Sequence, residues 1–274
     1  MHPAAKAILA ESCAVLDGRA AYPENARTDA FGYGRSERCV EGPWAASWLR
    51  DRSKILDIGY ALSSLDYLGL LLELKRRGTA ITGVDIIRPE RVATRYPAEW
   101  RADVLATPYL EGDIRTLDLP VAAFDAVACI STIEHVGFDI PSDRPDTAFA
   151  RWEKPGDVPQ KRDPNAARDV MAAIARALAP DGIAVITTPM GKGGPCLVQD
   201  SLGLWTKQQE ADAAGWNEII QAAGFEILGQ RFFLNTWDGG WLEVDGPADL
   251  TDVTADGRPH AAGAALCALR RVGS

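Results

Sequence analysis

Short apolar runs of strand length alternate with amphipathic stretches along most of the chain after residue 54. The clearest helical stretch covers residues 165–178, where Val170, Ile174 and Leu178 recur every four residues and Gly182 lies beyond the end. The apolar runs predict strands at 55–58, 80–84, 126–131, 183–188, 225–234 and 264–271. Helices are predicted at 62–77, 165–178 and 216–223, with a less regular unit at 92–105.

This order of elements predicts an α/β fold with a doubly wound, mostly parallel sheet. The last two strands can pair in an antiparallel manner, because no helical pattern separates them. Residues 1–50 do not follow the alternation and are expected to form an N-terminal helical cap, with a helix at 4–16, on an α/β domain at 51–274. Residues 138–164 and 235–263 are rich in Asp, Pro and Gly and are expected to form long loops at the carboxyl edge of the sheet.

Length and charge narrow the class of partner. The chain has 274 residues, 47% of them apolar, which suits one large domain. Its 29 basic and 38 acidic residues give a net charge of −9, which disfavours nucleic acid. No stretch reaches the roughly 20 apolar residues of a membrane helix, and the N-terminus lacks a secretory pattern. We therefore expect a cytoplasmic protein with small-molecule partners and no membrane partner; a homodimer is compatible with the sequence.

Metal binding is not expected. The five cysteines are odd in number and lack paired ligand spacing, so reduced, packed thiols are predicted. Asp139, Asp143, Asp146 and Asp157 offer carboxylates for Mg²⁺, but their loop setting favours a solvated acidic surface.

Acidic and glycine residues stand where successive predicted strands end. Gly59 permits a sharp turn that a ligand can approach closely. Asp85 can accept both hydroxyls of a ribose, and Asp113 can accept from the amine of adenine while Ile86 or Ile114 packs on the ring. Singly, each acid also suits a turn or a helix cap. Together they predict a site for a nucleoside-containing ligand.

From about residue 50 to 235 the chain resembles the class I S-adenosylmethionine-dependent methyltransferases. The resemblance rests on the segments 55–59, 83–85, 112–113, 124–135 and 178–185. It implies a Rossmann-like fold with a seven-stranded sheet, S-adenosyl-L-methionine as cofactor and a small-molecule acceptor. The cofactor residues that we expect in this range are Asp57, Gly59, Asp85, Ile86, Asp113, Ile114 and Ser131. Residues 33–41 also resemble the N-terminal part of small-molecule methyltransferases, which adds Tyr33 and suggests that this segment covers the carboxylate end of the cofactor.

The turn at Gly59-Tyr60-Ala61 departs from the family's usual Gly-x-Gly. This departure leaves an alternative open, a non-catalytic module that binds S-adenosylmethionine or another partner. A nicotinamide-dependent oxidoreductase is disfavoured, because the G-x-G-x-x-G fingerprint is absent.

His135 is the candidate catalytic residue. Methyl transfer is an in-line displacement, which depends mainly on alignment, but an oxygen nucleophile must also lose a proton. Histidine suits that task near neutral pH, although Glu134-His135 also suits a helix cap. Trp237 and Trp241 are expected either to line an acceptor pocket or to plug the end of the sheet. The function favoured by the sequence is O-methylation of a sugar or secondary metabolite.

Overall fold

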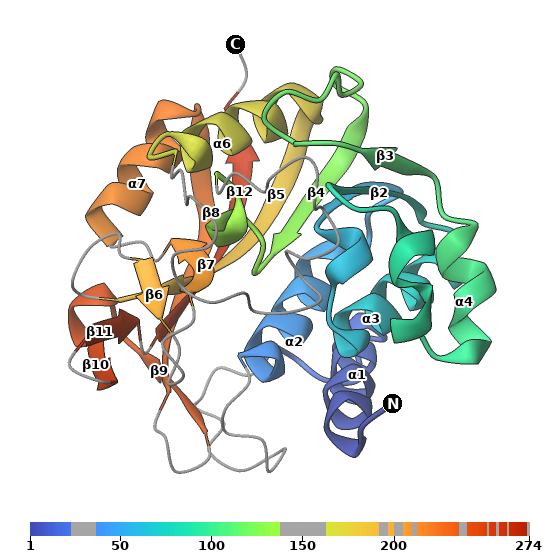
Figure 1. The fold of residues 1–274 in the computed structure, drawn as a ribbon, viewed down its shortest axis with the longest axis horizontal. Helices are drawn as coiled ribbons and strands as arrows, with labels where there is room; N and C mark the ends of the chain where they lie inside the picture. Colours follow the sequence, from blue (N-terminus) through green and yellow to red (C-terminus); the bar gives the residue numbers. More distant parts are fainter. Residues whose placement is uncertain are drawn as a thin grey trace.

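An eight-stranded sheet forms the centre of the computed structural model (Figure 1). The structure describes residues 1–22, 37–137, 163–191, 197–199, 205–209, 213–235, 240–250, 252–255, 258–261 and 263–272. The strand order is β3-β2-β1-β4-β5-β12-β8-β9. In chain order these strands are β1 (Lys54–Ile58), β2 (Ala80–Asp85), β3 (Tyr109–Glu111), β4 (Phe124–Ile130), β5 (Leu178–Met190), β8 (Phe225–Asn235), β9 (Trp241–Val244) and β12 (Gly263–Arg271).

The sheet is mostly parallel, as predicted. β1 pairs in parallel with β2 and β4, β2 with β3, and β4 with β5. β12 is antiparallel to both β5 and β8, so β8 runs in the same direction as β5. The carboxyl ends of β1, β2, β3, β4, β5 and β8 therefore meet at one edge, the carboxyl edge of the sheet. β9 adds an eighth strand, antiparallel to β8, to the seven that were expected.

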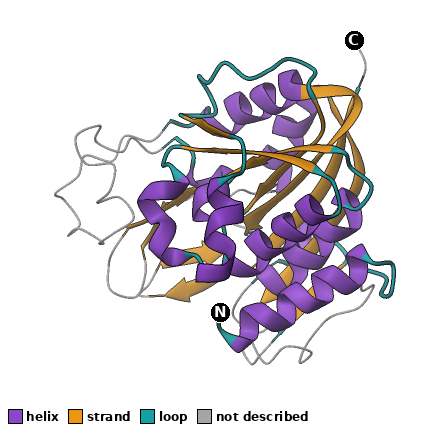
Figure 2. Cartoon of the chain, turned by 90° about the vertical axis from the view of Figure 1, so that its right-hand side faces the viewer, coloured by secondary structure: helices purple, strands orange, loops and turns teal. Residues whose placement is uncertain are grey.

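Helices cover both faces of the sheet (Figure 2). The first core lies between the sheet and α1 (Pro3–Leu16), α2 (Arg38–Leu49), α3 (Leu65–Arg76) and α4 (Ala98–Leu105). The second core lies between the sheet and α6 (Ala166–Ala177) and α7 (Ala213–Ala222). Residues of β4 alternate between them, with Ala126 and Ala128 in the first core and Val127 and Cys129 in the second. Both faces of these strands are buried, so they read as continuous apolar runs.

The N-terminal helices are fixed to the sheet by aromatic side chains. The Trp44 and Trp48 rings of α2 lie 5.7 Å apart. A β-carbon added at Gly229 of β8 would lie 3.0 Å from Trp48 Cζ2, so the helix approaches β8 closely where there is no side chain. The helix α1 confirms the one expected at 4–16, whereas α2 was not predicted, because Gly42 and Pro43 interrupt its pattern. The division of the chain at residue 50 stays a prediction.

Several element boundaries differ from those predicted. The helix α3 begins three residues later than expected, because the turn after β1 forms a short 3-10 helix, η1 (Tyr60–Leu62). The irregular unit at 92–105 is a second such helix, η2 (Pro89–Arg95), followed by α4. β5 begins at Leu178 instead of residue 183. Beyond β5, a two-stranded sheet consists of β6 (Leu197–Gln199) and β7 (Trp205–Gln209).

The expectation of a purely irregular stretch at 235–263 was wrong. It contains β9, the short helix η4 (Pro247–Asp249) and an antiparallel pair, β10 (Asp252–Ala255) and β11 (Arg258–Ala261). β9 was missed because glycines precede it and it is only four residues long. The other expected loop, at 138–164, lies outside the described residues up to residue 162, and so do its four aspartates.

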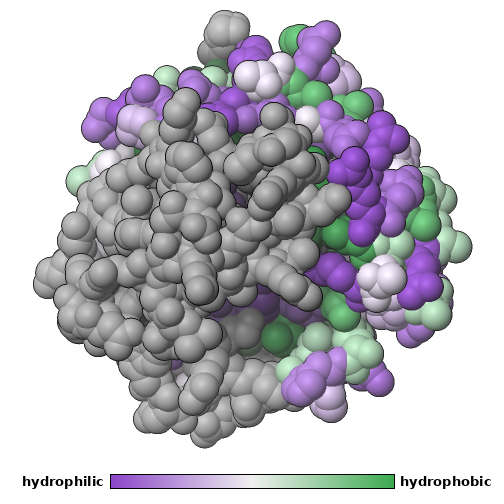
Figure 3. All heavy atoms as spheres, viewed as in Figure 1, coloured by the Kyte–Doolittle hydropathy of each residue, from purple (hydrophilic) through white to green (hydrophobic). Residues whose placement is uncertain are grey.

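Hydrophilic and hydrophobic residues mix on the described part of the face in Figure 3, which includes the surface around α4. Among the described helices, none is both long and apolar enough to cross a bilayer.

Candidate active site

The turn after β1 opens the site at the carboxyl edge. Gly59 has a φ of 92°, a conformation that side chains disfavour. A β-carbon there would also lie 2.4 Å from Thr132 Oγ1, so the close approach of the two segments excludes a side chain. The Gly59 N–H donates to the Val84 carbonyl at 2.8 Å and ties the turn to the end of β2. Two independent constraints therefore require glycine at this position.

Tyr60 and Ala61, which depart from the glycine pattern, fit the turn without distorting it. The Tyr60 ring is buried over β2, where a β-carbon added at Gly83 would lie 2.6 Å from its Cγ atom. Its hydroxyl donates to Thr107 Oγ1 at 3.0 Å, and burial raises its pKa to about 12. The bulky residue of the turn thus fills the first core and is matched by a glycine in the neighbouring strand.

Asp57 lies fully buried in β1, two residues before the turn. Its Oδ2 atom accepts a hydrogen bond of 2.6 Å from the Tyr67 hydroxyl, whereas Oδ1 has no partner among the described residues. Burial raises the pKa of this carboxyl to about 8, although the Tyr67 hydrogen bond acts in the opposite direction. Asp57 is therefore available as an acceptor or as a proton carrier near neutral pH.

Asp85 presents a buried carboxylate oxygen at the end of β2. Oδ1 accepts from the Ile86 N–H at 2.7 Å, and the buried Oδ2 has no partner in the described part of the chain. Burial raises the pKa of Asp85 to about 6, against the opposing effect of backbone N–H groups that include those of Ala61 and Leu62. The next side chain, Ile86, is 43% exposed. This arrangement fits a ribose hydroxyl on Asp85 and the flat face of a base on Ile86.

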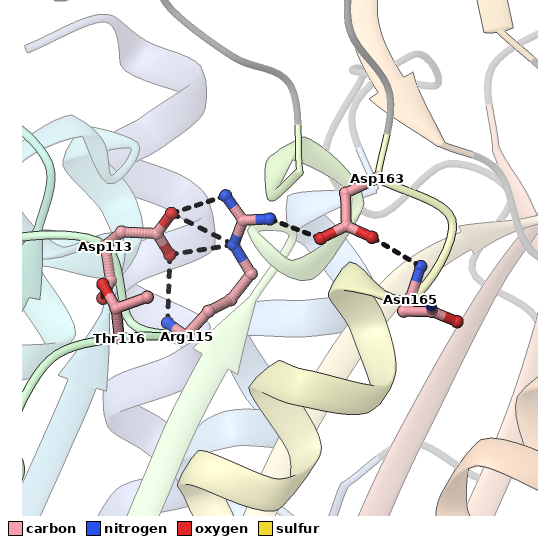
Figure 4. Close-up of polar contacts among 5 residues, drawn as sticks. All are labelled: Asp113, Arg115, Thr116, Asp163 and Asn165. Carbon is pink, nitrogen blue, oxygen red and sulfur yellow. Dashed lines mark hydrogen bonds and ion pairs between the residues drawn. The ribbon is translucent and has the colours of Figure 1, made fainter.

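Asp113 follows β3 and is held by Arg115 (Figure 4). The guanidinium donates from Nε to both carboxylate oxygens at 3.0 Å and from Nη2 to Oδ2 at 2.6 Å. Although partial burial opposes it, the hydrogen bonds from Arg115 lower the pKa of Asp113, so this acid is ionised at neutral pH. Ile114 is almost fully buried in the second core, so Ile86 offers the larger surface to a ring.

Ser131 ends β4 with a φ of 42° and joins the sheet to α2. Its hydroxyl donates to Glu41 Oε1 at 2.7 Å, and its N–H donates to Thr187 Oγ1 at 2.9 Å. Glu41 in turn pairs with Arg38 one helical turn earlier. Arg38 and Glu41 lie in the segment 33–41 that the sequence analysis singled out, but neither was named as a site residue; their signal was a pair of opposite charges three residues apart.

Glu134 and His135 lie on the short helix η3 (Ile133–His135) that follows β4. The Glu134 side chain is buried, and its Oε2 atom has no partner among the described residues. Burial raises the pKa of Glu134 to about 8, and nearby Glu41 adds to the effect. The His135 side chain is 48% exposed, with Nε2 3.9 Å from Glu134 Oε1. His135 is thus accessible to a ligand at the carboxyl edge.

The remaining candidates lie elsewhere. Tyr33 and Trp237 fall outside the described residues. Trp241 starts β9 opposite Asn235 and is buried in the first core, the arrangement expected of a plug. In the described segments, no group of three or more His, Cys, Asp or Glu residues could hold a metal ion, and Cys13, Cys39, Cys129 and Cys267 are free thiols.

The sheet order and the acids at its carboxyl edge are the arrangement expected of an α/β protein that binds a nucleoside at this edge. The family model described as "Methyltransferase domain" matches residues 68–154. No curated protein matches the chain. Over residues 68–154 the chain is thus similar in sequence to a methyltransferase domain, in agreement with the resemblance to class I S-adenosylmethionine-dependent methyltransferases.

Solved structures share the fold. The 1,6-didemethyltoxoflavin-N1-methyltransferase of Burkholderia thailandensis, crystallised with 1,6-didemethyltoxoflavin and S-adenosylhomocysteine, is 17% identical with a TM-score of 0.50; the match covers 100% of this chain and 92% of that one. The cyclase SpnF is 16% identical with a TM-score of 0.53, over 96% and 92% of the two chains. A Methanosarcina mazei methyltransferase is 14% identical with a TM-score of 0.50, over 85% and 98%. At these identities the likeness establishes the fold.

Proposed function

We propose that this protein is a cytoplasmic O-methyltransferase that acts on a sugar or a secondary metabolite. The cofactor assignment rests mainly on the buried Oδ2 atom of Asp85, which lies beside the Gly59 turn and has no partner among the described residues. A net charge of −9 supports a small acceptor over nucleic acid. The toxoflavin-type methyltransferase, crystallised with a small heterocyclic ligand, adds support for an acceptor of that size.

The residues of the carboxyl edge fit the cofactor from one end to the other. Asp57 and the Gly59 turn would hold the methionine part, Asp85 the ribose hydroxyls, and Asp113 with Ile86 the adenine. Within the described segments, one buried carboxyl oxygen of Asp57 and one of Asp85 have no hydrogen-bond partner, which costs free energy unless a ligand group reaches them. When bound, S-adenosylmethionine supplies an electrophilic methyl group on a sulfonium. Tyr60 and Ala61 support retention of the site, because their bulk is accommodated in the first core.

His135 would take the proton from the acceptor hydroxyl. Its imidazole is half exposed and lies just after β4, on the same edge as Gly59 and Asp85. A neutral imidazole accepts a proton at the ring nitrogen that carries no hydrogen. The remaining requirement is alignment of the hydroxyl with the methyl group, which loops at this edge would provide.

Cofactor binding is tested first, by calorimetric titration with S-adenosylmethionine and S-adenosylhomocysteine. We expect Asp85→Asn to weaken both by roughly ten- to a hundredfold, since hydrogen bonds to a charged group contribute about 1.5–3 kcal/mol. Asp118→Asn is the control, because Asp118 is an exposed acid that is not among the residues assigned to the cofactor. Equal affinities for wild type and Asp85→Asn would show that Asp85 does not bind the cofactor.

Turnover is tested with a panel of phenols, sugars and heterocyclic amines, with the methylated product detected by mass spectrometry. We expect hydroxyl acceptors to react and His135→Gln to lower turnover roughly a hundredfold while S-adenosylhomocysteine affinity stays within about twofold. Methylation of amines alone would refute the oxygen acceptor. If His135→Gln turns over as fast as wild type, His135 is not the base that takes the proton from the acceptor. The elution volume in size-exclusion chromatography shows whether the protein is a monomer or a homodimer.

A further inference from the structure

Four acids from different elements surround the guanidinium of Arg38. Although burial acts in the opposite direction, all four raise the pKa of Arg38, so each of them lies within interacting range of it. The four acids, which we call the acid cluster, are Glu37 just before α2, Glu41 in α2, Asp66 in the first turn of α3 and Glu134 in η3. Four carboxyl groups thus lie around one positive charge.

Glu41 is the member of the acid cluster with a partner for each oxygen. Its Oε2 atom pairs with Arg38, and its Oε1 atom accepts from the Ser131 hydroxyl at 2.7 Å. These contacts form a fixed link between α2 and the end of β4.

Glu134 and Asp66 are each left with a buried oxygen. Glu134 Oε2 and Asp66 Oδ2 have no hydrogen-bond partner in the described part of the chain. The Glu134 side chain is 3% exposed, and Asp66 is 5% exposed. Burial raises the pKa of both carboxyls, because Arg38 and their own backbone N–H groups offset only part of its cost. A buried acid in this state gains free energy when a positive charge arrives.

The two acids lie on either side of the Gly59 turn. On one side, a β-carbon at Gly59 would meet Thr132, which stands two residues before Glu134. On the other side, the turn continues through η1 into the first residues of α3, which include Asp66. In the proposed function the turn holds the methionine part of the cofactor and Asp85 holds the ribose. The sulfur atom joins these two parts, so it would lie beside the turn and close to the acid cluster.

We propose that the acid cluster makes the site selective for the positively charged sulfonium of S-adenosylmethionine over the neutral thioether of S-adenosylhomocysteine. The inference rests on the proposed function. The attraction between two charges is about four times stronger at an effective dielectric constant of about 20 than in water. Transfer of the methyl group leaves the sulfur neutral, so the product loses this attraction and leaves more readily than the substrate. The cluster would thereby limit inhibition by the product.

The test measures calorimetric Kd values for three ligands at one pH and one ionic strength. S-adenosylmethionine and sinefungin carry a positive charge at this position, as a sulfonium and as a protonated amine, whereas S-adenosylhomocysteine carries none. We expect wild type to bind both cationic ligands at least about tenfold more tightly than S-adenosylhomocysteine. In Glu134→Gln this preference should fall below about threefold, while the affinity for S-adenosylhomocysteine stays within about twofold.

Two further variants make the result decisive. Asp66→Asn removes the second uncompensated carboxyl and should lower the preference in the same direction. Glu99→Gln is the matched control, because it makes the same change of charge at an exposed position of α4 and should keep the wild-type preference. Thermal melts confirm that each variant is folded.

A parallel loss of affinity for all three ligands in Glu134→Gln would show a general structural role and overturn the proposal. So would a wild-type preference that persists in both Glu134→Gln and Asp66→Asn. If wild type binds the three ligands equally well, the acid cluster does not sense the charge on sulfur and only this inference fails. If wild type binds none of them, the proposed function fails with it.

Discussion

At the scale of single residues, Glu134 is a buried acid whose charge the apo protein does not fully compensate. Its pKa of about 8 lies above the ordinary 4.5, so between these values the folded state keeps a proton that the unfolded state has released. Stability should therefore fall as pH rises from about 4.5 to 8 and stay at the lower level above 8. Glu134→Gln should gain at least about 1.4 kcal/mol of unfolding free energy relative to wild type between pH 5 and pH 9. Denaturant unfolding at both pH values, without cofactor, measures this difference.

Asp118→Asn, an exposed acid, provides the comparison and should show no such gain. A Glu134→Gln variant whose unfolding free energy keeps the wild-type dependence on pH would show that Glu134 is already ionised in the folded protein.

At the scale of elements, the turn after β1 packs on β2 because the Tyr60 ring lies over Gly83, which has no side chain. A β-carbon at Gly83 would lie 2.6 Å from Cγ and 2.8 Å from Cβ of Tyr60, so one of the two elements must move. We expect Gly83→Ala to lower the unfolding free energy by roughly 1–3 kcal/mol, the usual cost of overpacking. S-adenosylhomocysteine should also bind more weakly, because the displaced turn carries Gly59. Denaturant unfolding and calorimetry give the two values.

Gly246→Ala is a suitable control, since a β-carbon there meets no atom within 4 Å. The double variant Tyr60→Leu/Gly83→Ala should cost less than the sum of the single changes. Strict additivity would mean that the two residues do not share this space.

At the scale of the whole molecule, the cap helices and the sheet share one core, so we expect them to unfold as one cooperative unit. The first core joins Ile8 of α1 and Trp44 of α2 to Ile55 of β1, and the Ser131–Glu41 hydrogen bond joins α2 to the carboxyl edge. We expect one thermal transition by circular dichroism and tryptophan fluorescence. With S-adenosylhomocysteine at a hundred times its Kd, the unfolding free energy should rise by about 2.7 kcal/mol.

Hydrogen exchange provides the independent check on this cooperativity. Amides of α2 should be protected to nearly the same degree as those of β1 and β4, with and without S-adenosylhomocysteine. Separate transitions by the two optical probes, or early exchange confined to α1 and α2, would contradict a single unit.

Much of the fold follows from local pattern alone. β1, β2, β4, β8, β12 and α6 were predicted within a few residues, because strands buried on both faces read as apolar runs and α6 has one apolar face. The missed elements have weak local signals. Pro43 interrupts α2, which is stabilised by Trp44 and Trp48 against β8, and β9 is a four-residue edge strand held by its pairing with β8. Tertiary packing, which no local pattern records, determines both.

By itself, the sequence determined the alternation of strands and helices, the glycine turn and the positions of Asp57 and Asp85 at strand ends, because these features depend on spacing along the chain. The three-residue strand before Asp113 was not predicted. Only the tertiary structure decided which of their oxygens lack a partner among the described residues and that Tyr60 packs over Gly83. It also decided that Arg115, which pairs with Asp113, contacts Asp163, 48 residues after Arg115. The physical reason is that burial, pKa and hydrogen-bond satisfaction arise from contacts between segments that are distant in sequence.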